Sequence, residues 1–245
     1  MKIAVIIPAY NEEASIGRVI AAIPRPPVDD VVVANNNSSD RTAEVAQDAG
    51  ARVVLAAERG YGAACLQGIE EARRLGAEII IFLDGDFSDY PEEIPLLIAP
   101  ILEEKFDMVI GSRIRGRRER GALTPQQRFG GWLACALMKL FFHANYTDLG
   151  PFRAIAMPAL ERLNMQDRNY GWTVEMQIKA ARANLRVTEI PVRYRKRIGK
   201  SKISGTVKGV ILAGWKIVTT ILKYAVTPSR HSRSVNERRA RTLLS

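Results

Sequence analysis

Two carboxylates stand one residue apart, directly after an apolar run at 79–83: Asp84 and Asp86, with Gly85 between them. Aspartate oxygens are hard ligands of the kind that Mg2+ or Mn2+ prefers, and a cation held in this way keeps open positions for a substrate's phosphates. An isolated Asp-x-Asp pair after a strand can equally be a simple acidic turn. The pair therefore predicts a metal site only if other groups converge on it.

Further polar groups follow the first two apolar runs of the chain. Tyr10 and Glu12 follow the first run, and Asn35, Asn36 and Asp40 follow the second. The carboxyl ends of parallel strands meet at one edge of an open α/β sheet, which is where ligands bind in such folds. An aromatic ring can stack on a nucleobase, and a carboxylate can accept hydrogen bonds from its N–H groups. Three strand ends with such side chains predict a nucleotide site at this edge.

A dinucleotide-binding fold competes for the same pattern of strands. It requires a glycine-rich turn directly after the first strand. The turn at 8–12 has no glycine, and Gly60 and Gly62 begin a fingerprint whose third glycine is replaced by Cys65. The sequence therefore argues against a dehydrogenase.

The chain is strongly basic, with a net charge of +10 and a pI of about 9.9. This charge favours an anionic partner, such as a nucleotide, a lipid phosphate, a membrane surface or nucleic acid. The arginines and lysines gather in three clusters, at 113–120, 193–202 and 230–241. Because aromatic residues are not interleaved with these clusters as stacking platforms would be, we expect no nucleic-acid partner.

The first half of the chain predicts strands that alternate with helices. We expect Pro8 to stop the first strand and Asn11 to cap the first helix. Alternation at this spacing predicts an α/β fold with a mostly parallel, doubly wound sheet. The expected strands lie at 3–7, 31–34, 52–55, 79–83 and 108–110, and the expected helices at 11–23, 41–49 and 60–75.

The second half is less regular. It predicts helices at 126–142, 158–163 and 172–183, a turn-rich segment at 146–153 and a strand at 186–194. The segment 205–227 is expected to be an amphipathic helix, and Lys216 in its middle argues against a membrane span. Such a helix can lie in a membrane interface, pack on the domain or meet a second subunit in a homodimer. The tail at 228–245 is basic and expected to be mobile.

Composition limits the class of protein. The chain has 245 residues, 47% of them hydrophobic, which is enough for one large folded domain. Cys65 and Cys135 are too few and too scattered for a disulfide framework or a zinc site. Met1 leads straight into a strand without a signal peptide. We therefore expect a cytoplasmic protein, either free or peripheral on the cytoplasmic face of the membrane.

Several motifs together resemble the family-two glycosyltransferases. Later motifs narrow the resemblance to the dolichol-phosphate (polyprenyl-phosphate) mannosyl- and glucosyltransferase branch. The resemblance covers roughly residues 1 to 205. The motifs are, in chain order, Ile6-Ile7-Pro8-Ala9-Tyr10-Asn11-Glu12, Asn36-x-Ser38-x-Asp40-x-Thr42, Asp84-Gly85-Asp86, Gly111-Ser112-Arg113, Thr147-Asp148-x-Gly150-x-Phe152-Arg153, Glu189-Ile190-Pro191-Val192 and Arg197-Ile198-Gly199-Lys200-Ser201-Lys202.

The resemblance implies a fold and an activity. The fold is the GT-A type, a Rossmann-like sheet flanked by helices over 1–204. Residues 1–112 would form the nucleotide-sugar half and 113–204 the acceptor half. The activity is a metal-dependent, inverting transfer of a hexose from GDP-mannose or UDP-glucose, with Mg2+ or Mn2+ as cofactor. The acceptor is expected to be a polyprenyl phosphate.

The resemblance also implies site residues. Asp84 and Asp86 would hold the metal and, with Arg113, form the catalytic group. The rest of the nucleotide-sugar site would be Pro8, Ala9, Tyr10, Glu12, Ala34, Asn36 and Gly85, with Arg197 and Lys202 closing over the diphosphate. The acceptor side would be formed by Arg115, Arg117, Asp148, Arg153, Trp172 and Glu175.

The chain departs from the family pattern in ways that leave donor and acceptor open. Asn35 and Asn36 replace two aspartates. An amide can pair with uracil, whereas a carboxylate suits the paired N–H donors of guanine, so both donors stay open. Ser88 stands where mannosyl relatives carry glutamine. A hydroxyl acceptor would need a base, with Asp148 or Glu175 as candidates, but a lipid phosphate would not.

Three alternatives to the polyprenyl-phosphate transferase follow. The first is a cytosolic transferase to a soluble hydroxyl acceptor. The second is a catalytically silent, nucleotide-sugar-binding partner of a membrane protein. The third is a sugar nucleotidyltransferase, which would need a glycine-rich loop with lysine after the first strand, and the turn at 8–12 has neither.

Overall fold

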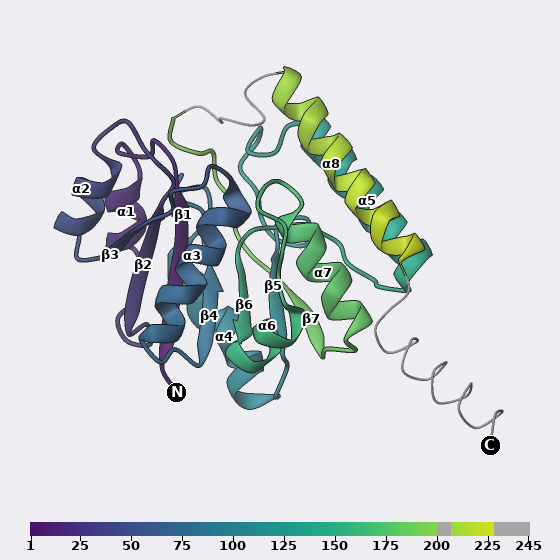
Figure 1. Ribbon diagram of the computed structural model, residues 1–245, viewed down its shortest axis with the longest axis horizontal. Helices are drawn as coiled ribbons and strands as arrows, with labels where there is room; N and C mark the ends of the chain where they lie inside the picture. The colour runs from purple at the N-terminus through teal and green to yellow at the C-terminus, as the bar shows by residue number, and fades with distance from the viewer. Residues whose placement is uncertain (200–206, 228–245) are drawn as a thin grey trace.

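The computed structural model describes residues 1–199 and 207–227 (Figure 1). Lys202, the start of the expected helix at 205–227 and the expected mobile tail at 228–245 lie outside the described residues. The strands are β1 Ile3–Ala9, β2 Asp30–Asn35, β3 Arg52–Leu55, β4 Ile79–Phe82, β5 Met108–Ser112, β6 Arg153–Ala156 and β7 Val187–Pro191. The helices are α1 Ile16–Ala21, α2 Thr42–Asp48, α3 Tyr61–Arg74, the 3-10 helix η1 Pro91–Glu93, α4 Ile94–Glu103, α5 Pro125–Phe142, α6 Met157–Leu163, α7 Trp172–Arg182 and α8 Val207–Val226.

The strands form one sheet in the order β3-β2-β1-β4-β6-β5-β7. Strand β6 runs antiparallel to both of its neighbours, and the other pairs are parallel. This confirms the predicted mostly parallel sheet. Strand β6 itself was not predicted, because its four residues begin with a charged side chain, Arg153, inside a segment rich in turn residues.

The central strands bury both faces of the sheet. In β1, Ile3, Val5 and Ile7 face one core, together with residues of α1, α2 and α4. The intervening Ala4 and Ile6 face a second core, which contains residues of α3, α6 and α7. Side chains of a strand alternate between faces, so an unbroken apolar run is the pattern expected for a strand covered on both sides. The sheet edge that follows these strands is thereby held rigidly.

The first loop differs from the prediction in two ways. Strand β1 passes through Pro8 to Ala9, where it pairs with β2, whereas its pairing with β4 ends at Ile6. Proline is tolerated where a neighbouring strand is missing on one side. Helix α1 begins at Ile16, not at Asn11, because Asn11 adopts a left-handed conformation with φ of 54°. Its Oδ1 accepts a hydrogen bond from the Ser39 amide at 2.8 Å.

Helices α5 and α8 lie side by side at the end of the molecule opposite α1 and α2 (Figure 1). Thr124 caps α5 through a reciprocal pair of hydrogen bonds with Gln127. Buried residues from α5, α7 and α8 share a third apolar core. Within the described residues, no helix is long and apolar enough to cross a membrane.

Candidate active site

A cavity of about 370 Å3 opens at the sheet edge that follows β1, β2 and β4. Most of the predicted nucleotide-sugar residues line it together. They are Pro8, Ala9, Tyr10, Glu12, Asn36, Asp84, Gly85, Asp86 and Arg197. The structure adds residues that the sequence analysis did not select: Arg59, Gly60, Tyr61, Ala64, Asn169 and Tyr170. We call this space the first cavity.

The two aspartates after β4 stand at the wall of the first cavity in a partly dehydrated setting. Burial, and secondly the neighbouring charge of Asp86, raise the pKa of Asp84 to about 7. The Tyr61 hydroxyl donates to Asp84 Oδ1 at 3.0 Å. Asp86 Oδ1 accepts from the backbone N–H and the hydroxyl of Ser88, at 2.9 and 2.5 Å. Two carboxylates held this close in a low-dielectric setting favour a bound cation.

A cationic group already lies against Asp86, the second acid of the pair. Arg197 Nη2 is 2.7 Å from Asp86 Oδ2 and 3.7 Å from Glu12 Oε1. The Ile198 amide also donates to the Asp86 carbonyl at 2.9 Å, which fixes the segment that carries Arg197. The guanidinium stands where a positive charge is favoured, and the oxygen ligands suit Mg2+ or Mn2+.

The metal site would be completed by groups other than side chains. Among residues 1–199 and 207–227, no group of three or more His, Cys, Asp and Glu side chains could hold a metal. Mg2+ is usually bound by one or two carboxylates together with water and substrate phosphates. The residues present therefore fit a cation that arrives with a nucleotide diphosphate.

A third acid lies behind the pair. Asp89 is 1% exposed, and neither of its carboxyl oxygens has a hydrogen-bond partner in the described structure. Burial, and secondly the charge of Asp84, raise the pKa of Asp89 well above its usual range. Burial and the charge of Asp84 therefore both disfavour the ionised form of Asp89.

The wall of the first cavity includes an aromatic ring, that of Tyr10. The Arg59 guanidinium carbon lies 4.1 Å from the centre of the Tyr10 ring. Asn36 fixes the turn that presents Arg59: its Nδ2 donates to the carbonyls of Ala56 and Glu58, at 3.0 and 2.6 Å, and its Oδ1 accepts from the Gly60 amide at 2.8 Å. Both amide hydrogens of Asn36 are thus used within the protein.

Ala34 does not line the first cavity. It is completely buried and packs with Ala56 and with Ala64, which itself lines the cavity. The predicted contact of Ala34 with the nucleotide is therefore corrected. Its methyl group supports the cavity wall from within the core. Because the side chains there are small, the turn at 56–60 can lie close to β2. Signals for the missed Arg59 were weak, since a lone arginine before a glycine is common on protein surfaces.

A second cavity, of about 980 Å3, meets the first at the acid pair. Asp84, Asp86 and Arg197 line both cavities. The second cavity extends to α5 and α8, with apolar and basic residues in its wall. Its lining includes Arg113, Leu123, Trp132, Cys135, Lys139, Tyr146, Asp148, Leu149, Tyr194 and Ile217. The acid pair therefore stands at the junction of two differently shaped spaces.

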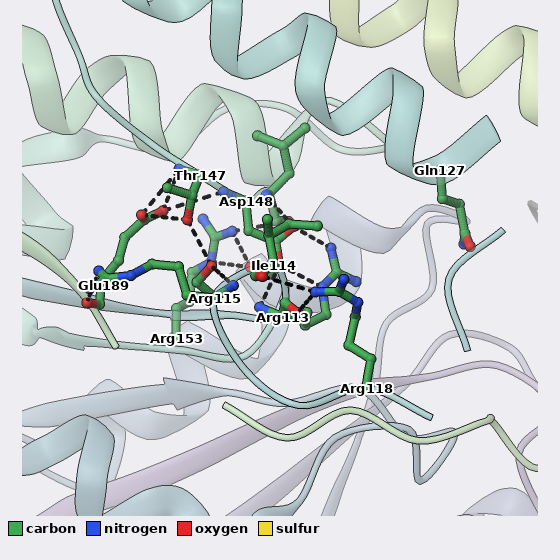
Figure 2. A network of polar contacts seen from close by, with 12 residues as sticks. Arg113, Ile114, Arg115, Arg118, Gln127, Thr147, Asp148, Arg153 and Glu189 are labelled. Carbon is green, nitrogen blue, oxygen red and sulfur yellow. Dashed lines mark hydrogen bonds and ion pairs between the residues drawn. The ribbon is translucent and has the colours of Figure 1, made fainter. Parts of the chain in front are cut away.

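Arg113 is clamped by Asp148 (Figure 2). Its Nε and Nη2 donate to Oδ2 and Oδ1 of Asp148, both at 2.8 Å, and its backbone N–H donates to Oδ2 at 2.8 Å. Burial alone would raise the pKa of Asp148, but the attraction and hydrogen bonds of Arg113 outweigh it and lower the pKa. An ionised, fully engaged carboxylate with a lowered pKa is a poor general base.

A network around Glu189 supports this clamp (Figure 2). Glu189 accepts from the amide of Thr147 at 2.9 Å and from its hydroxyl at 2.7 Å. Arg115 Nη1 donates to the Glu189 carbonyl at 2.7 Å. Arg115 thus holds β7 and does not line either cavity. The side chain of Arg117 is exposed.

Three further residues predicted on the acceptor side lie in the packing behind the cavities. Arg153 is 1% exposed and donates to the carbonyls of Gly150 and Thr173, and burial lowers its pKa to about 10. Trp172 packs edge-on against Phe82, with ring centres 6.0 Å apart. Glu175 is also buried and bonds to backbone amides. None of the three lines either cavity.

Comparison with known proteins agrees with this geometry. The model of the family described as glycosyl transferase family 2 matches residues 4–163. An uncharacterized glycosyltransferase of Mycobacterium tuberculosis is 35% identical over 222 residues, which are 89% of this chain and 98% of that protein. A dolichyl-phosphate hexose transferase of Haloferax volcanii is 31% identical over 231 residues, covering 90% of this chain and 94% of that protein.

More distant matches come from a further sequence relative and from a solved structure. An undecaprenyl-phosphate mannosyltransferase of Micrococcus luteus is 28% identical over 224 residues, 85% of this chain and 90% of that protein. A crystal structure of glucosyl-3-phosphoglycerate synthase from Mycobacterium tuberculosis, in complex with Mn2+, UDP and glucosyl-3-phosphoglycerate, superposes with a TM-score of 0.75 at 22% identity. The match covers 94% of this chain and 81% of that one. This likeness confirms the predicted GT-A type fold.

Proposed function

This chain belongs to glycosyl transferase family 2, and we propose that it moves a hexose from a nucleotide sugar to a polyprenyl phosphate. The family membership confirms the resemblance predicted from the motifs. The observation that supports the proposal most is the position of the acid pair, Asp84 and Asp86, at the junction of two cavities. One cavity suits a nucleotide, and the other is larger, extends to α5 and α8, and has apolar and basic walls.

The donor would lie in the first cavity. Its base would lie beside Tyr10 and Arg59, and its diphosphate would reach Arg197. Charge developing on the leaving diphosphate would be neutralised by a divalent cation, Mg2+ or Mn2+, held by Asp84 and Asp86. Both UDP-glucose and GDP-mannose remain candidates, because the amide hydrogens of Asn36 are used within the protein.

The acceptor would enter through the second cavity. A phosphate oxygen of the lipid would attack the anomeric carbon, and the bond from that carbon to the diphosphate would break on the opposite side, which inverts the configuration. A lipid phosphate is already anionic at pH 7, so no base is needed. This agrees with an Asp148 that is engaged by Arg113 and has a lowered pKa. Lys139 and Arg128 supply positive charge in this cavity, whereas the charge of Arg113 is balanced by Asp148.

A lipid acceptor requires access to a membrane surface, and α5 and α8 carry large exposed apolar side chains beside the second cavity. They include Phe129, Trp132, Leu140, Phe141, Leu212, Trp215 and Leu222. Exposed apolar residues with interspersed lysines are typical of helices that lie in a membrane interface. We propose that these two helices hold the enzyme on the membrane as a peripheral protein.

Calorimetric titration tests the donor half of this proposal. UDP-glucose and GDP-mannose are each titrated into the protein with Mn2+ and with EDTA. We expect one donor to bind in the presence of Mn2+ and to bind at least about tenfold more weakly in EDTA. Equal binding with and without the cation would contradict the role of Asp84 and Asp86. Metal-dependent binding without any turnover would favour a silent binding partner over an enzyme.

A further inference from the structure

The segment 164–171, which connects α6 to α7, forms one wall of the first cavity. Asn169 and Tyr170 line that cavity. The Arg168 carbonyl accepts a hydrogen bond from the Ala63 amide at 3.0 Å, at the start of α3. Arg168 also pairs with Glu58 at 2.6 Å, on the turn next to Arg59. The position of this segment therefore sets the shape of the space in which the donor would bind.

Glu175 holds the segment from behind. The Glu175 side chain is 2% exposed, so its charge depends on partners within the protein. It accepts hydrogen bonds from the amides of Gln166 and Asp167, at 3.1 and 2.7 Å. Its two remaining partners are Lys179, at 2.8 Å, and the hydroxyl of Tyr224, at 2.8 Å. Tyr224 belongs to α8, and the other groups do not.

Asp167 makes a second connection to α8. Its Oδ1 accepts from the amides of Asn169 and Gly171, at 2.8 and 3.0 Å, which fixes the turn that presents Asn169 to the first cavity. Its Oδ2 lies 3.0 Å from Lys216 Nζ. The Asp167 side chain is only 9% exposed, so loss of the lysine would leave a nearly buried carboxylate with less compensation.

We propose that α8 positions the donor-binding wall through Lys216–Asp167 and Tyr224–Glu175, which makes Asp167 and Glu175 positioning residues for the nucleotide sugar. The predicted role of Glu175 as a base for the acceptor does not follow from its place in the packing. Its hydrogen bonds go to the backbone of a donor-side segment. The inference rests on the proposed function, since it assumes that the first cavity binds the donor.

The same helix carries an exposed face. Trp215 is 71% exposed and Leu222 is 45% exposed. In the sequence, Trp215 precedes Lys216, and Leu222 lies two residues before Tyr224. A partner that contacts this exposed face would touch the same helix whose Lys216 and Tyr224 contact Asp167 and Glu175. The second cavity is also lined by α8, through Ile217. Helix α8 thus contacts both the acceptor side and the residues that hold the donor wall.

The test compares Tyr224→Phe and Lys216→Gln with the wild type, using Lys223→Gln as a matched control on the same helix. Lys223 is an exposed lysine, so its replacement makes the same change in net charge. Hydrogen–deuterium exchange of the full chain reports on the segment directly. We expect the amides of Asp167, Asn169 and Gly171 to exchange faster in both variants and to be unchanged in Lys223→Gln.

Donor affinity and steady-state kinetics complete the test. For UDP-glucose or GDP-mannose with Mn2+, we expect Kd and the donor KM to rise about threefold to tenfold in Tyr224→Phe, with the acceptor KM unchanged. We expect the same rise in Lys216→Gln, whereas Lys216→Arg should keep the wild-type values because it keeps the ion pair with Asp167.

Unchanged exchange in 164–171 in both variants would overturn the inference. So would an equal rise of donor and acceptor KM. If the exchange rises as expected but the wild type binds no nucleotide sugar, the positioning of the segment stands and the proposed function fails.

Discussion

At the scale of single residues, the acid pair combines a structural cost with a functional use. Burial, and secondly the repulsion between Asp84 and Asp86, raise the pKa of Asp84 to about 7. Arg197 relieves part of the repulsion through its contact with Asp86. A carboxylate pair kept despite such a cost is expected where charge is needed for binding or catalysis.

Replacing one of these carboxylates should separate activity from stability. In Asp86→Asn the shape is kept and the repulsion is removed, so we expect hexose transfer to fall by at least about a hundredfold. The melting temperature should stay within about 3 °C of the wild type, because the lost ion pair and the lost repulsion offset one another. Transfer assays measure the loss of activity, and calorimetric melting measures the change in melting temperature. Near-wild-type activity that still depends on metal would refute the assignment of Asp86 as a ligand.

Asp148 gives a pH-dependent prediction. Its folded-state pKa lies below the ordinary value, so its contribution to stability is complete above about pH 4 and is lost as the pH falls through the lowered pKa. Asp148→Asn should cost about 3 kcal/mol at pH 7, because Arg113 loses its buried partner.

Urea unfolding at pH 7 and at pH 3 measures this contribution. The difference between wild type and Asp148→Asn should shrink at pH 3, because the carboxyl of the unfolded chain takes up a proton below its ordinary pKa while the lowered pKa of native Asp148 resists protonation. An equal difference in stability at both pH values would show that the pair with Arg113 does not lower the pKa of Asp148.

At the scale of elements, the backbone at the start of α3 lies so close to the backbone of the segment 164–171 that no side chain fits between them. A Cβ added at Gly62 would lie 2.0 Å from the Asp167 carbonyl oxygen, and one at Gly60 would lie 2.1 Å from that of Arg168. These glycines were noticed in the sequence as the beginning of a dinucleotide fingerprint. The structure gives them another reason: the close approach of two elements that together form the donor wall.

Gly62→Ala should therefore displace the donor wall. We expect a loss of about 1–3 kcal/mol in the free energy of unfolding and weaker nucleotide binding, because a backbone carbonyl has to move. Gly130→Ala in α5 is the matched control, since nothing lies within 4 Å of its added Cβ. It should gain up to about 1 kcal/mol through helix propensity. Urea unfolding compares the two, and a harmless Gly62→Ala would contradict the close contact.

The elements themselves were predictable where hydrophobic pattern decides. Strand β3 at Arg52–Leu55 and the long helices α3, α5 and α7 were predicted close to their observed bounds. The helix-capping pattern was misleading at Asn11, because its side chain bonds to Ser39 on another loop and α1 begins only at Ile16. Strand β6 was not predicted, because Arg153 is buried through hydrogen bonds to carbonyls and the periodicity of apolar residues does not reveal such burial.

The candidate site was predictable to the extent that motifs mark strand ends. Tyr10, Glu12, Asp84 and Asp86 come together because their strands are parallel neighbours. Arg59, Asn169 and Tyr170 lie on loops whose approach depends on tertiary packing, so the local sequence marks Arg59 only weakly and does not mark Asn169 or Tyr170.

At the scale of the whole molecule, positive charge and exposed apolar surface occur together. The net charge is +10, and large exposed apolar side chains gather on α5 and α8. Anionic lipids attract basic proteins, and apolar side chains then bury in the interface. Such a combination predicts membrane binding that needs both contributions.

Vesicle sedimentation tests this surface. The double variant Phe129→Ser/Trp215→Ser removes two side chains that are 62% and 71% exposed. We expect binding to vesicles with anionic lipids to weaken by about tenfold or more, because two aromatic burials are lost. Nucleotide affinity in solution should be unchanged, since neither residue lines the first cavity. Undiminished vesicle binding by the variant would exclude α5 and α8 as the membrane-facing surface.

The most direct measurement follows a labelled hexose from UDP-glucose or GDP-mannose into a lipid that can be extracted with organic solvent. The assay contains detergent, polyprenyl phosphate and Mn2+, with parallel reactions in EDTA and with a soluble hydroxyl acceptor. We expect the label from one donor to enter the lipid fraction only when the cation is present. Label on the hydroxyl acceptor alone, or transfer that continues in EDTA, would contradict a metal-dependent transferase to a lipid phosphate.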